Sequence, residues 1–255
     1  MGVPVILWDF DGTLATRPGR WSTCVVEVLD EHMPAHGATR QQVAKFLNNG
    51  FPWHDWEKVH DDLCNPDDWW EPVLTLITDA MIRIGVGPDK AASLAPRFRE
   101  SFVDPARWHV FPDSLQALRL SGSAGWRNVI VSNHVPELPD LVFQLGLTDH
   151  IHAVVNSAEH GHEKPHPQAF RLALQAAGDP ITAWIVGDNP IADIAGAAEV
   201  GIPGVLARAP EFDSAFIERI ETSYGHARFP DWMRCCDKRA STAVEAVQLI
   251  LSHSA

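Results

Sequence analysis

The chain has 255 residues, of which 45% are hydrophobic and 21% are charged. This is the composition of an ordinary globular protein, and it excludes intrinsically disordered and fibrous classes. The 33 acidic residues outnumber the 20 lysines and arginines, and the resulting net charge of −13 argues against nucleic acid as the main partner.

The length suits one large α/β domain, or a core that carries a smaller insert. No apolar run approaches the roughly 20 residues that span a bilayer, and the N-terminus lacks the features of a secretory signal. Four cysteines lack the spacing of a disulfide scaffold or a zinc site, and the adjacent pair Cys235 and Cys236 is expected to be two unpaired thiols. We therefore expect a soluble cytoplasmic protein, a monomer or homodimer, with no membrane partner.

Residues 3–10 form a nearly continuous apolar run, which predicts a strand buried on both faces of a parallel sheet. Runs of the same character follow at residues 128–132, 152–156, 182–186 and 203–207. The segments between them have helical periodicity and mostly end in glycine: residues 114–120, 139–146, 167–178 and 191–201. This alternation predicts βαβ units and an α/β fold with a doubly wound, mostly parallel sheet.

Residues 16–106 interrupt this alternation, because they show helical periodicity without a buried strand. Thr39 and Gln42 have the spacing of a capping box. Further helices are expected over residues 21–29, 72–85 and 88–103, the last bent or broken at Pro96. We predict a helical cap subdomain at 16–106, inserted into a catalytic core made of residues 1–15 and 107–255. The last part of that core, from about residue 211, should hold one amphipathic helix at 241–251 and no chemistry.

Asp9 and Asp11 stand directly after the first predicted strand, and Gly12 permits a sharp turn there. Such a turn would place both carboxylates at the carboxyl edge of the sheet, where open α/β folds bind ligands. Two carboxylates held close together repel each other unless a divalent cation lies between them. The pair therefore indicates a metal-dependent site.

Three later groups of polar residues follow in the same way. Ser132 and Asn133 end the second apolar run, and Lys164 precedes the helix that begins near residue 167. Asp188 follows the apolar run at 182–186, and Asp193 comes five residues later. Together with the first pair they supply four carboxylates, a hydroxyl and a lysine, an inventory that suits Mg²⁺ and a phosphoryl group.

In this order, the motifs DxDGT at 9–13, Ser132-Asn133, Lys164-Pro165 and GDxxxxD at 187–193 resemble those of the haloacid dehalogenase superfamily of hydrolases. The resemblance covers nearly the whole chain, and residues 16–106 are similar to the helical cap that one branch inserts after the first motif. It implies that Asp9 is the nucleophile that forms an aspartyl-phosphate. It also implies that Asp11 protonates the leaving oxygen and then activates water.

The resemblance implies a role for each remaining motif residue. Ser132 and Lys164 would hold the phosphoryl oxygens, while Thr13 and Asn133 would assist in substrate binding. Asp188 would bind Mg²⁺ with Asp9 and the backbone carbonyl of Asp11. Asp193 would lie behind these ligands and orient Lys164 or a water on the metal.

The cap is expected to contact the leaving group through a turn at residues 50–54 that presents Trp53 and His54. Arg17 and Arg20 would add positive charge near the entrance. The alternative is that Trp53 packs inside the cap and His54 is solvated. A cluster of His160, His162 and His166 matches no zinc motif, and its role stays open.

Asp11 favours phosphoryl transfer over carbon–halogen cleavage, because family dehalogenases have a non-acidic residue at this position. We therefore expect a Mg²⁺-dependent phosphatase that acts on a small phosphorylated metabolite. The alternatives are a phosphomutase, a phosphonate hydrolase and a catalytically silent binding protein on the same scaffold. A phosphonate hydrolase would need a lysine in the cap, and the candidates are Lys45, Lys58 and Lys90.

Overall fold

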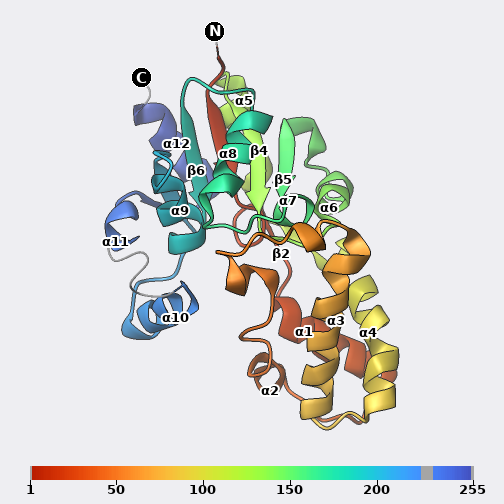
Figure 1. Ribbon diagram of the computed structural model, residues 1–255. Coiled ribbons are helices and arrows are strands. Elements are labelled where there is room, and N and C mark those ends of the chain that lie inside the picture. Colours follow the sequence, from red (N-terminus) through yellow and green to blue (C-terminus); the bar gives the residue numbers. More distant parts are fainter. Residues whose placement is uncertain (1, 225–231, 254–255) are drawn as a thin grey trace.

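In the computed structural model, which describes residues 2–224 and 232–253, a six-stranded parallel sheet forms the centre of the molecule (Figure 1). The strand order is β5-β4-β1-β6-β7-β8. The strands are β1 (Val5–Trp8), β4 (Arg127–Ser132), β5 (Ala153–Asn156), β6 (Ala183–Gly187), β7 (Gly204–Ala207) and β8 (Arg239–Ala240). The five predicted strands and the α/β class are confirmed, whereas β8 is too short to produce a recognisable pattern.

The central position of β1 explains why it is apolar throughout. It pairs in parallel with β4 on one side and β6 on the other, and its four residues are buried. Its side chains alternate between the two faces, as in any strand. Ile6 and Trp8 join one hydrophobic cluster, and Val5 and Leu7 join the other.

Helices cover both faces of this sheet. α5 (Ser114–Ser123) and α12 (Ala243–His253) pack together on one face, and α8 (Pro167–Ala176) and α9 (Gly196–Ala198) on the other. The π-helical segment η5 (Pro190–Ala195) leads directly into α9. The remaining core helices are α6 (Leu138–Gln144), η4 (Thr148–His150), α7 (Ser157–His160), α10 (Ser214–Tyr224) and α11 (Trp232–Cys235).

The segment predicted as the cap is helical and lies beyond the carboxyl edge of the sheet (Figure 1). It contains α1 (Arg20–His32), α2 (Arg40–Ala44), η1 (Pro52–Asp55), η2 (Asp61–Leu63), α3 (Pro66–Arg83) and α4 (Pro88–Val103). Its two connections to the core run side by side, because β2 (Ala15–Thr16) pairs antiparallel with β3 (His109–Val110). The short helix η3 (Pro105–Arg107) precedes β3. The domain boundaries at 15/16 and 106/107 stay a prediction.

Two helices of the cap differ from the predicted ones. α3 begins at Pro66 rather than at residue 72, because the Asn65 side chain accepts from the Asp67 N–H and caps the helix there. α4 continues through Pro96, which is exposed, so the carbonyl left without a partner one turn earlier can be hydrated. The capping box of Thr39 and Gln42 is confirmed.

Within residues 2–224 and 232–253, no helix combines the length and the apolar character that a membrane span requires.

Candidate active site

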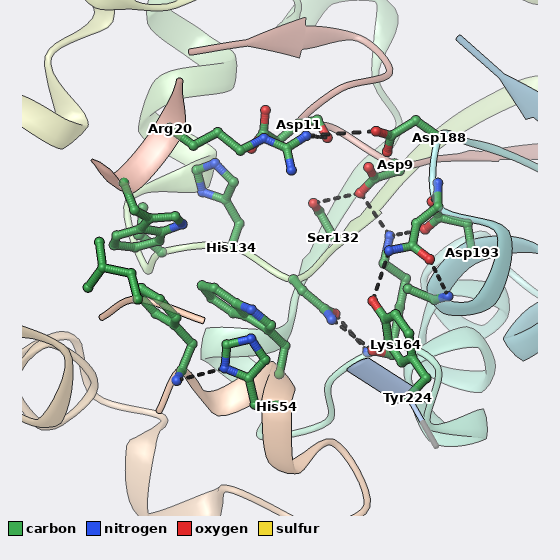
Figure 2. A pocket seen from close by; sticks show the side chains of 18 of the residues that line it. Asp9, Asp11, Arg20, His54, Ser132, His134, Lys164, Asp188, Asp193 and Tyr224 are labelled. Atoms are coloured by element: carbon green, nitrogen blue, oxygen red, sulfur yellow. Dashed lines mark hydrogen bonds and ion pairs between the residues drawn. The ribbon is translucent and has the colours of Figure 1, made fainter. Parts of the chain in front are cut away.

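The carboxyl edge of the sheet brings the predicted motif residues together. Asp9 follows β1, Ser132 ends β4 and Asp188 follows β6, and these three strands are neighbours in the sheet. Lys164 reaches the same point from the loop before α8 (Figure 2). Parallel strands with crossover helices necessarily place their carboxyl ends at one edge, which is why distant motifs converge there.

Asp9 has one carboxylate oxygen fixed and one unbound. The Ser132 hydroxyl donates to Asp9 Oδ1 at 2.9 Å, and Lys164 Nζ donates to the same oxygen at 2.8 Å. Asp9 Oδ2 makes no hydrogen bond within the part of the chain that the structure describes. The carboxylate is therefore oriented, and one oxygen is left for another task.

Lys164 is buried and held on both sides. Its ammonium also donates to Asp193 Oδ1 at 2.5 Å. Burial lowers the pKa of Lys164, but the charges of Asp193 and Asp9 outweigh this effect and keep the pKa above its usual value. Asp193 Oδ2 in turn accepts from the Asn189 N–H at 2.9 Å. Lys164 is therefore charged and fixed in place.

Asn133 lines the cavity but uses its side chain to hold the Lys164 loop. Its Nδ2 donates to the Lys164 carbonyl at 2.8 Å, and its Oδ1 accepts from the Lys164 N–H at 2.7 Å. These bonds occupy the amide on both sides. The structure thus gives Asn133 a positioning role toward Lys164.

Asp9, Asp188 and Asp193 offer carboxylate oxygens that lie within 4.8 Å of one another. Burial and the charges of Asp9 and Asp193 raise the pKa of Asp188 well above its usual value. Because Lys164 and Asn189 already occupy the oxygens of Asp193, the carboxylates available to a metal are those of Asp9 and Asp188. These two carboxylates and the backbone carbonyl of Asp11 are oxygen ligands that suit a hard cation such as Mg²⁺.

Gly12 is required for this arrangement. Its φ is +99°, and a Cβ at this position would lie 2.4 Å from Asp188 Oδ2. Only glycine allows the chain to turn here and to approach Asp188 so closely.

Asp11 lies beside Asp9, and its pKa is raised to about 6. Burial is the main cause and the Asp9 charge adds to it, whereas Arg20 opposes it. Arg20 Nε lies 3.0 Å from Asp11 Oδ2, and Arg20 Nη2 is 3.3 Å from the Asp11 carbonyl oxygen and 3.7 Å from Asp188 Oδ2. Arg20 thus contacts the same oxygens that a metal bound to Asp188 and the Asp11 carbonyl would use.

These residues form the floor of a cavity of about 230 Å³ between the core and the cap. The cap brings both predicted turn residues, Trp53 and His54, to this cavity. The Trp53 ring stacks on Phe51 at 4.6 Å between centroids, and His54 Nδ1 accepts from the Phe51 N–H at 3.1 Å. The full lining is Asp9, Asp11, Arg20, Trp21, Leu47, Phe51, Trp53, His54, Phe102, Ser132, Asn133, His134, Val135, Lys164, Asp188, Asn189, Ala192, Asp193 and Tyr224.

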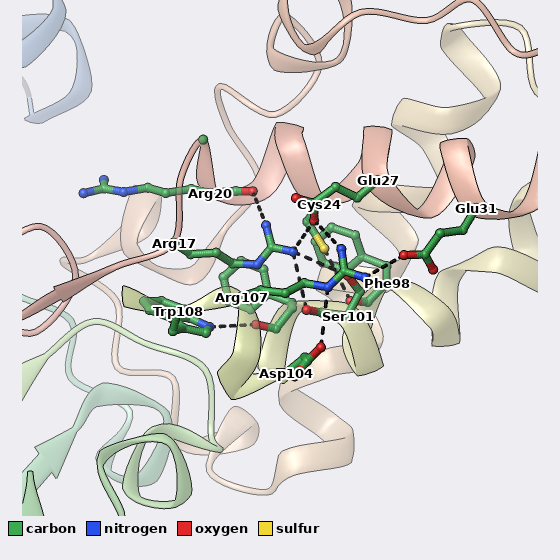
Figure 3. A network of polar contacts seen from close by, with 12 residues as sticks. Arg17, Arg20, Cys24, Glu27, Glu31, Phe98, Ser101, Asp104, Arg107 and Trp108 are labelled. Atoms are coloured by element: carbon green, nitrogen blue, oxygen red, sulfur yellow. Dashed lines mark hydrogen bonds and ion pairs between the residues drawn. The ribbon is translucent and has the colours of Figure 1, made fainter. Parts of the chain in front are cut away.

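Two residues expected to bind substrate do not line the cavity. Thr13 is fully buried, and its carbonyl accepts from Arg208 Nε at 3.0 Å. Arg17 is 1% exposed and forms an ion pair with Glu27 inside the base of the cap (Figure 3). In this structure both residues pack against neighbours behind the site, and their predicted contact with substrate stays a prediction.

The other open motifs also lie outside the cavity. His162 and His166 stack on each other at 4.9 Å, and no group of three metal-binding side chains among the described residues includes a histidine. None of the four cysteines forms a disulfide in the described parts of the chain.

The sequence places His134 beside Ser132-Asn133 among the histidines that could lie near the leaving group, and His134 does line the cavity. Tyr224 also lines it, and sequence reasoning missed this residue. Tyr224 ends α10, in a region where no chemistry was expected, and its hydroxyl accepts from Asn189 Nδ2 at 2.8 Å. No local pattern connects that helix with the site.

Comparison with known proteins agrees with this geometry. The family model of haloacid dehalogenase-like hydrolases matches residues 3–201. The haloacid dehalogenase-like hydrolase domain-containing protein 3 of Mus musculus is 33% identical over 151 residues, covering 58% of this chain and 59% of that protein. A phosphoserine phosphatase of Thermus thermophilus is 34% identical over 129 residues, covering 50% of this chain and 51% of that protein. The matched region is thus between half and three fifths of each relative's length.

Solved structures show the same fold. The HAD-hydrolase YfnB of Bacillus subtilis, bound to magnesium, has a TM-score of 0.69 at 17% identity, covering 99% of this chain and 100% of that one. The family match over residues 3–201 and the convergence of all four motifs at one sheet edge lead to one assignment. The chain belongs to the haloacid dehalogenase-like hydrolases.

Proposed function

We propose that the protein is a Mg²⁺-dependent phosphatase that hydrolyses a small phosphomonoester through an aspartyl-phosphate on Asp9. The observation that carries this proposal is the pair of carboxylates at the end of β1. Asp9 has a carboxylate oxygen without a hydrogen bond, and beside it Asp11 has a pKa of about 6. A nucleophile next to a group that can give and take a proton near neutral pH is what two-step phosphoryl transfer requires.

In the first step, a carboxylate oxygen of Asp9 attacks phosphorus, the P–O bond of the ester breaks, and Asp11 gives its proton to the departing alcohol oxygen. In the second step, Asp11 takes a proton from a water molecule whose oxygen attacks the phosphorus of the aspartyl-phosphate. This releases phosphate and regenerates Asp9. Asp11 Oδ1 is buried and has no hydrogen-bond partner among the described residues, so it is available to hold that proton.

The cations of the site stabilise the charge of the phosphoryl group. Lys164 and Ser132 already converge on Asp9 and would hold the phosphoryl oxygens as the attack proceeds. Asp9, Asp188 and the Asp11 carbonyl would hold Mg²⁺, which when bound would supply positive charge that stabilises the transferring phosphoryl group. The name of the Thermus relative, a phosphoserine phosphatase, supports this reaction class.

The geometry disfavours a phosphonate hydrolase. Such an enzyme would need a cap lysine at the substrate, and none of Lys45, Lys58 and Lys90 lines the cavity within the described chain. The phosphomutase alternative shares the aspartyl-phosphate and differs in the acceptor, so release of inorganic phosphate distinguishes the two.

The proposal predicts phosphate release from at least one member of a panel of phosphorylated metabolites when Mg²⁺ is present. Chelation and Asp188→Ala should both abolish it, and Ca²⁺ should substitute poorly because it favours more ligands and a looser geometry. Asp9→Asn should reduce turnover by several orders of magnitude, and Asp11→Asn by about 10²–10⁴-fold. Asp140→Asn is the matched control, because Asp140 is exposed on α6 and does not line the cavity. Full activity of Asp9→Asn, or full activity in chelator, would contradict the proposal.

A further inference from the structure

The cavity above Asp9 has an apolar wall opposite its charged floor. Five of the seven residues that the cap contributes are apolar or aromatic: Trp21, Leu47, Phe51, Trp53 and Phe102. The rings form one contiguous group: Trp21 stacks on Phe102 at 4.1 Å and lies tilted against Phe51 at 4.5 Å between centroids. This wall lines the same cavity as Ser132 and Lys164, which Figure 2 shows beside Asp9, so a leaving group in the cavity would contact it.

Three polar side chains beside this wall, those of His134, His54 and Tyr224, carry no positive charge at neutral pH. Burial lowers the pKa of His134 to about 4, and burial also lowers the pKa of His54. His54 further accepts a hydrogen bond through Nδ1, which requires that nitrogen to be unprotonated. The Tyr224 phenol completes the wall from the core side and is neutral as well, because burial raises its pKa.

Both cations at the cavity are already committed to carboxylates. Lys164 contacts Asp9 and Asp193, and Arg20 contacts Asp11 and Asp188. Among the described lining residues there is no further lysine or arginine. In this structure a carboxylate or a second phosphate on the leaving group would therefore meet two cations that are each paired with carboxylates. Arg20 shares its partners with the proposed metal, so it is the cation that the test below must address.

The volume of the cavity is large enough for a leaving group of one ring. An apolar cavity of roughly 150 Å³ is enough to hold benzene. The cavity here measures about 230 Å³, and six of its lining residues also border a neighbouring hollow of about 470 Å³, so it admits the phosphoryl group together with one ring or a short branched chain.

We infer that the substrate of the phosphatase proposed above is the monophosphate of a small, uncharged alcohol with an aromatic or apolar body. The aromatic wall would bind that body, and the two neutral imidazoles would contact its edge.

The test compares two esters that differ by one charge, benzyl phosphate and 4-carboxybenzyl phosphate. Both release a primary benzylic alcohol, so the chemical step is closely matched. We expect kcat/KM for benzyl phosphate to be higher by about tenfold or more, the lower end of what one feature of a pocket discriminates. A ratio near one, or a preference for the carboxylated ester, would overturn the inference.

Variants show whether the wall causes the preference. Trp53→Lys adds a cation at the wall and should lower kcat/KM for benzyl phosphate while raising it for the carboxylated ester. The matched control is Ile82→Ala, an exposed apolar residue of α3 that does not line the cavity, and it should leave the ratio unchanged. If the parent enzyme prefers the carboxylated ester and Arg20→Gln removes that preference, Arg20 is an anion site and the inference fails.

The same reagents separate this inference from the proposed function. If no phosphate is released from any ester, the phosphatase proposal fails, while calorimetric binding of the two esters to the unmodified protein still tests the pocket. Tighter binding of benzyl phosphate would then support the uncharged class, and equal or weaker binding would contradict it. If other phosphomonoesters are hydrolysed and the benzyl ester is not preferred, only the substrate inference fails.

Discussion

Four aspartate side chains and two cationic side chains line the cavity. The carboxylates belong to Asp9, Asp11, Asp188 and Asp193, and the cations to Lys164 and Arg20. Ionisation of all six groups would leave a charge of +2 − 4 = −2 in a buried place. This excess explains why the pKa values of Asp188, Asp193 and Asp11 are raised, since burial and like charges disfavour further ionisation. A divalent cation would balance the charge.

Glu163, which precedes Lys164 in the chain, should make the free energy of unfolding depend on pH, whether or not the protein is catalytically active. It is 1% exposed, and burial raises its pKa from 4.5 to about 8, against the opposing effects of Ser157 and Lys164. Between these two pH values the folded state keeps a proton that the unfolded state has lost. The free energy of unfolding should therefore fall as pH rises, by at most about 1.4 kcal/mol per pH unit.

Glu163→Gln removes this proton linkage and keeps the shape of the side chain. The melting temperature of the variant, relative to that of the parent, should rise steadily from about pH 5 to about pH 8. Thermal unfolding of both proteins across this range, without metal, measures the difference. Parallel curves would show that Glu163 does not retain its proton in the folded state.

A polar network at the base of the cap links four elements (Figure 3). Arg17, next to β2, pairs with Glu27 of α1 and contacts the Ser101 carbonyl of α4 at 3.4 Å. Arg107 of η3 joins the same Glu27 carboxylate at 3.0 Å. Because the two connections to the core end in this network, Glu27 ties them to the cap helices and fixes where the cap begins.

Glu27→Gln should lower the free energy of unfolding by on the order of 3 kcal/mol, because it leaves the buried Arg17 without its counter-ion. The control is Glu31→Gln, which removes an ion pair to Arg107 in which the Glu31 side chain is 51% exposed. Such surface pairs contribute about 0–1 kcal/mol. Urea unfolding of the two variants and the parent gives the comparison. Equal decreases in the free energy of unfolding for the two variants would show that the buried Arg17–Glu27 pair stabilises the fold no more than the exposed pair does.

At the scale of elements, the order of strands and helices and the meeting of the motif residues could be predicted from the sequence. Buried strands have a continuous apolar pattern, and the residues after parallel strands share one edge. The contacts of Arg17, Arg20 and Tyr224 could not be predicted, because they depend on how α1, α4 and α10 pack in three dimensions. A charged residue near a hinge looks the same in sequence whether it faces the cavity or a buried glutamate.

At the scale of the whole molecule, the cap rests on the core at a few defined contacts. The Glu137 carboxylate, at the start of α6 in the core, accepts from the Trp70 indole at 3.1 Å and pairs with Arg99 at 2.9 Å. On the other side, the His60 N–H donates to the Gly161 carbonyl at 2.8 Å. The cavity lies between the two parts, so in the proposed reaction the core would supply the catalytic residues and the cap the apolar wall. A closed cap would keep bulk water away from the ester during phosphoryl transfer.

The central claim is that Asp9 itself becomes phosphorylated. The most direct test mixes the protein with Mg²⁺ and an ester that it hydrolyses, and then quenches the reaction with acid. The quenched protein is reduced with borohydride, and its peptides are mapped by mass spectrometry. Borohydride reduces an aspartyl-phosphate to homoserine and leaves a free aspartate unchanged. If Asp9 is the nucleophile, homoserine appears at position 9 only when both Mg²⁺ and substrate are present, and Asp11→Asn accumulates more of it if that change slows breakdown more than formation. Phosphate release in which Asp9 stays an aspartate and homoserine appears at another position would contradict the assignment of Asp9 as the nucleophile.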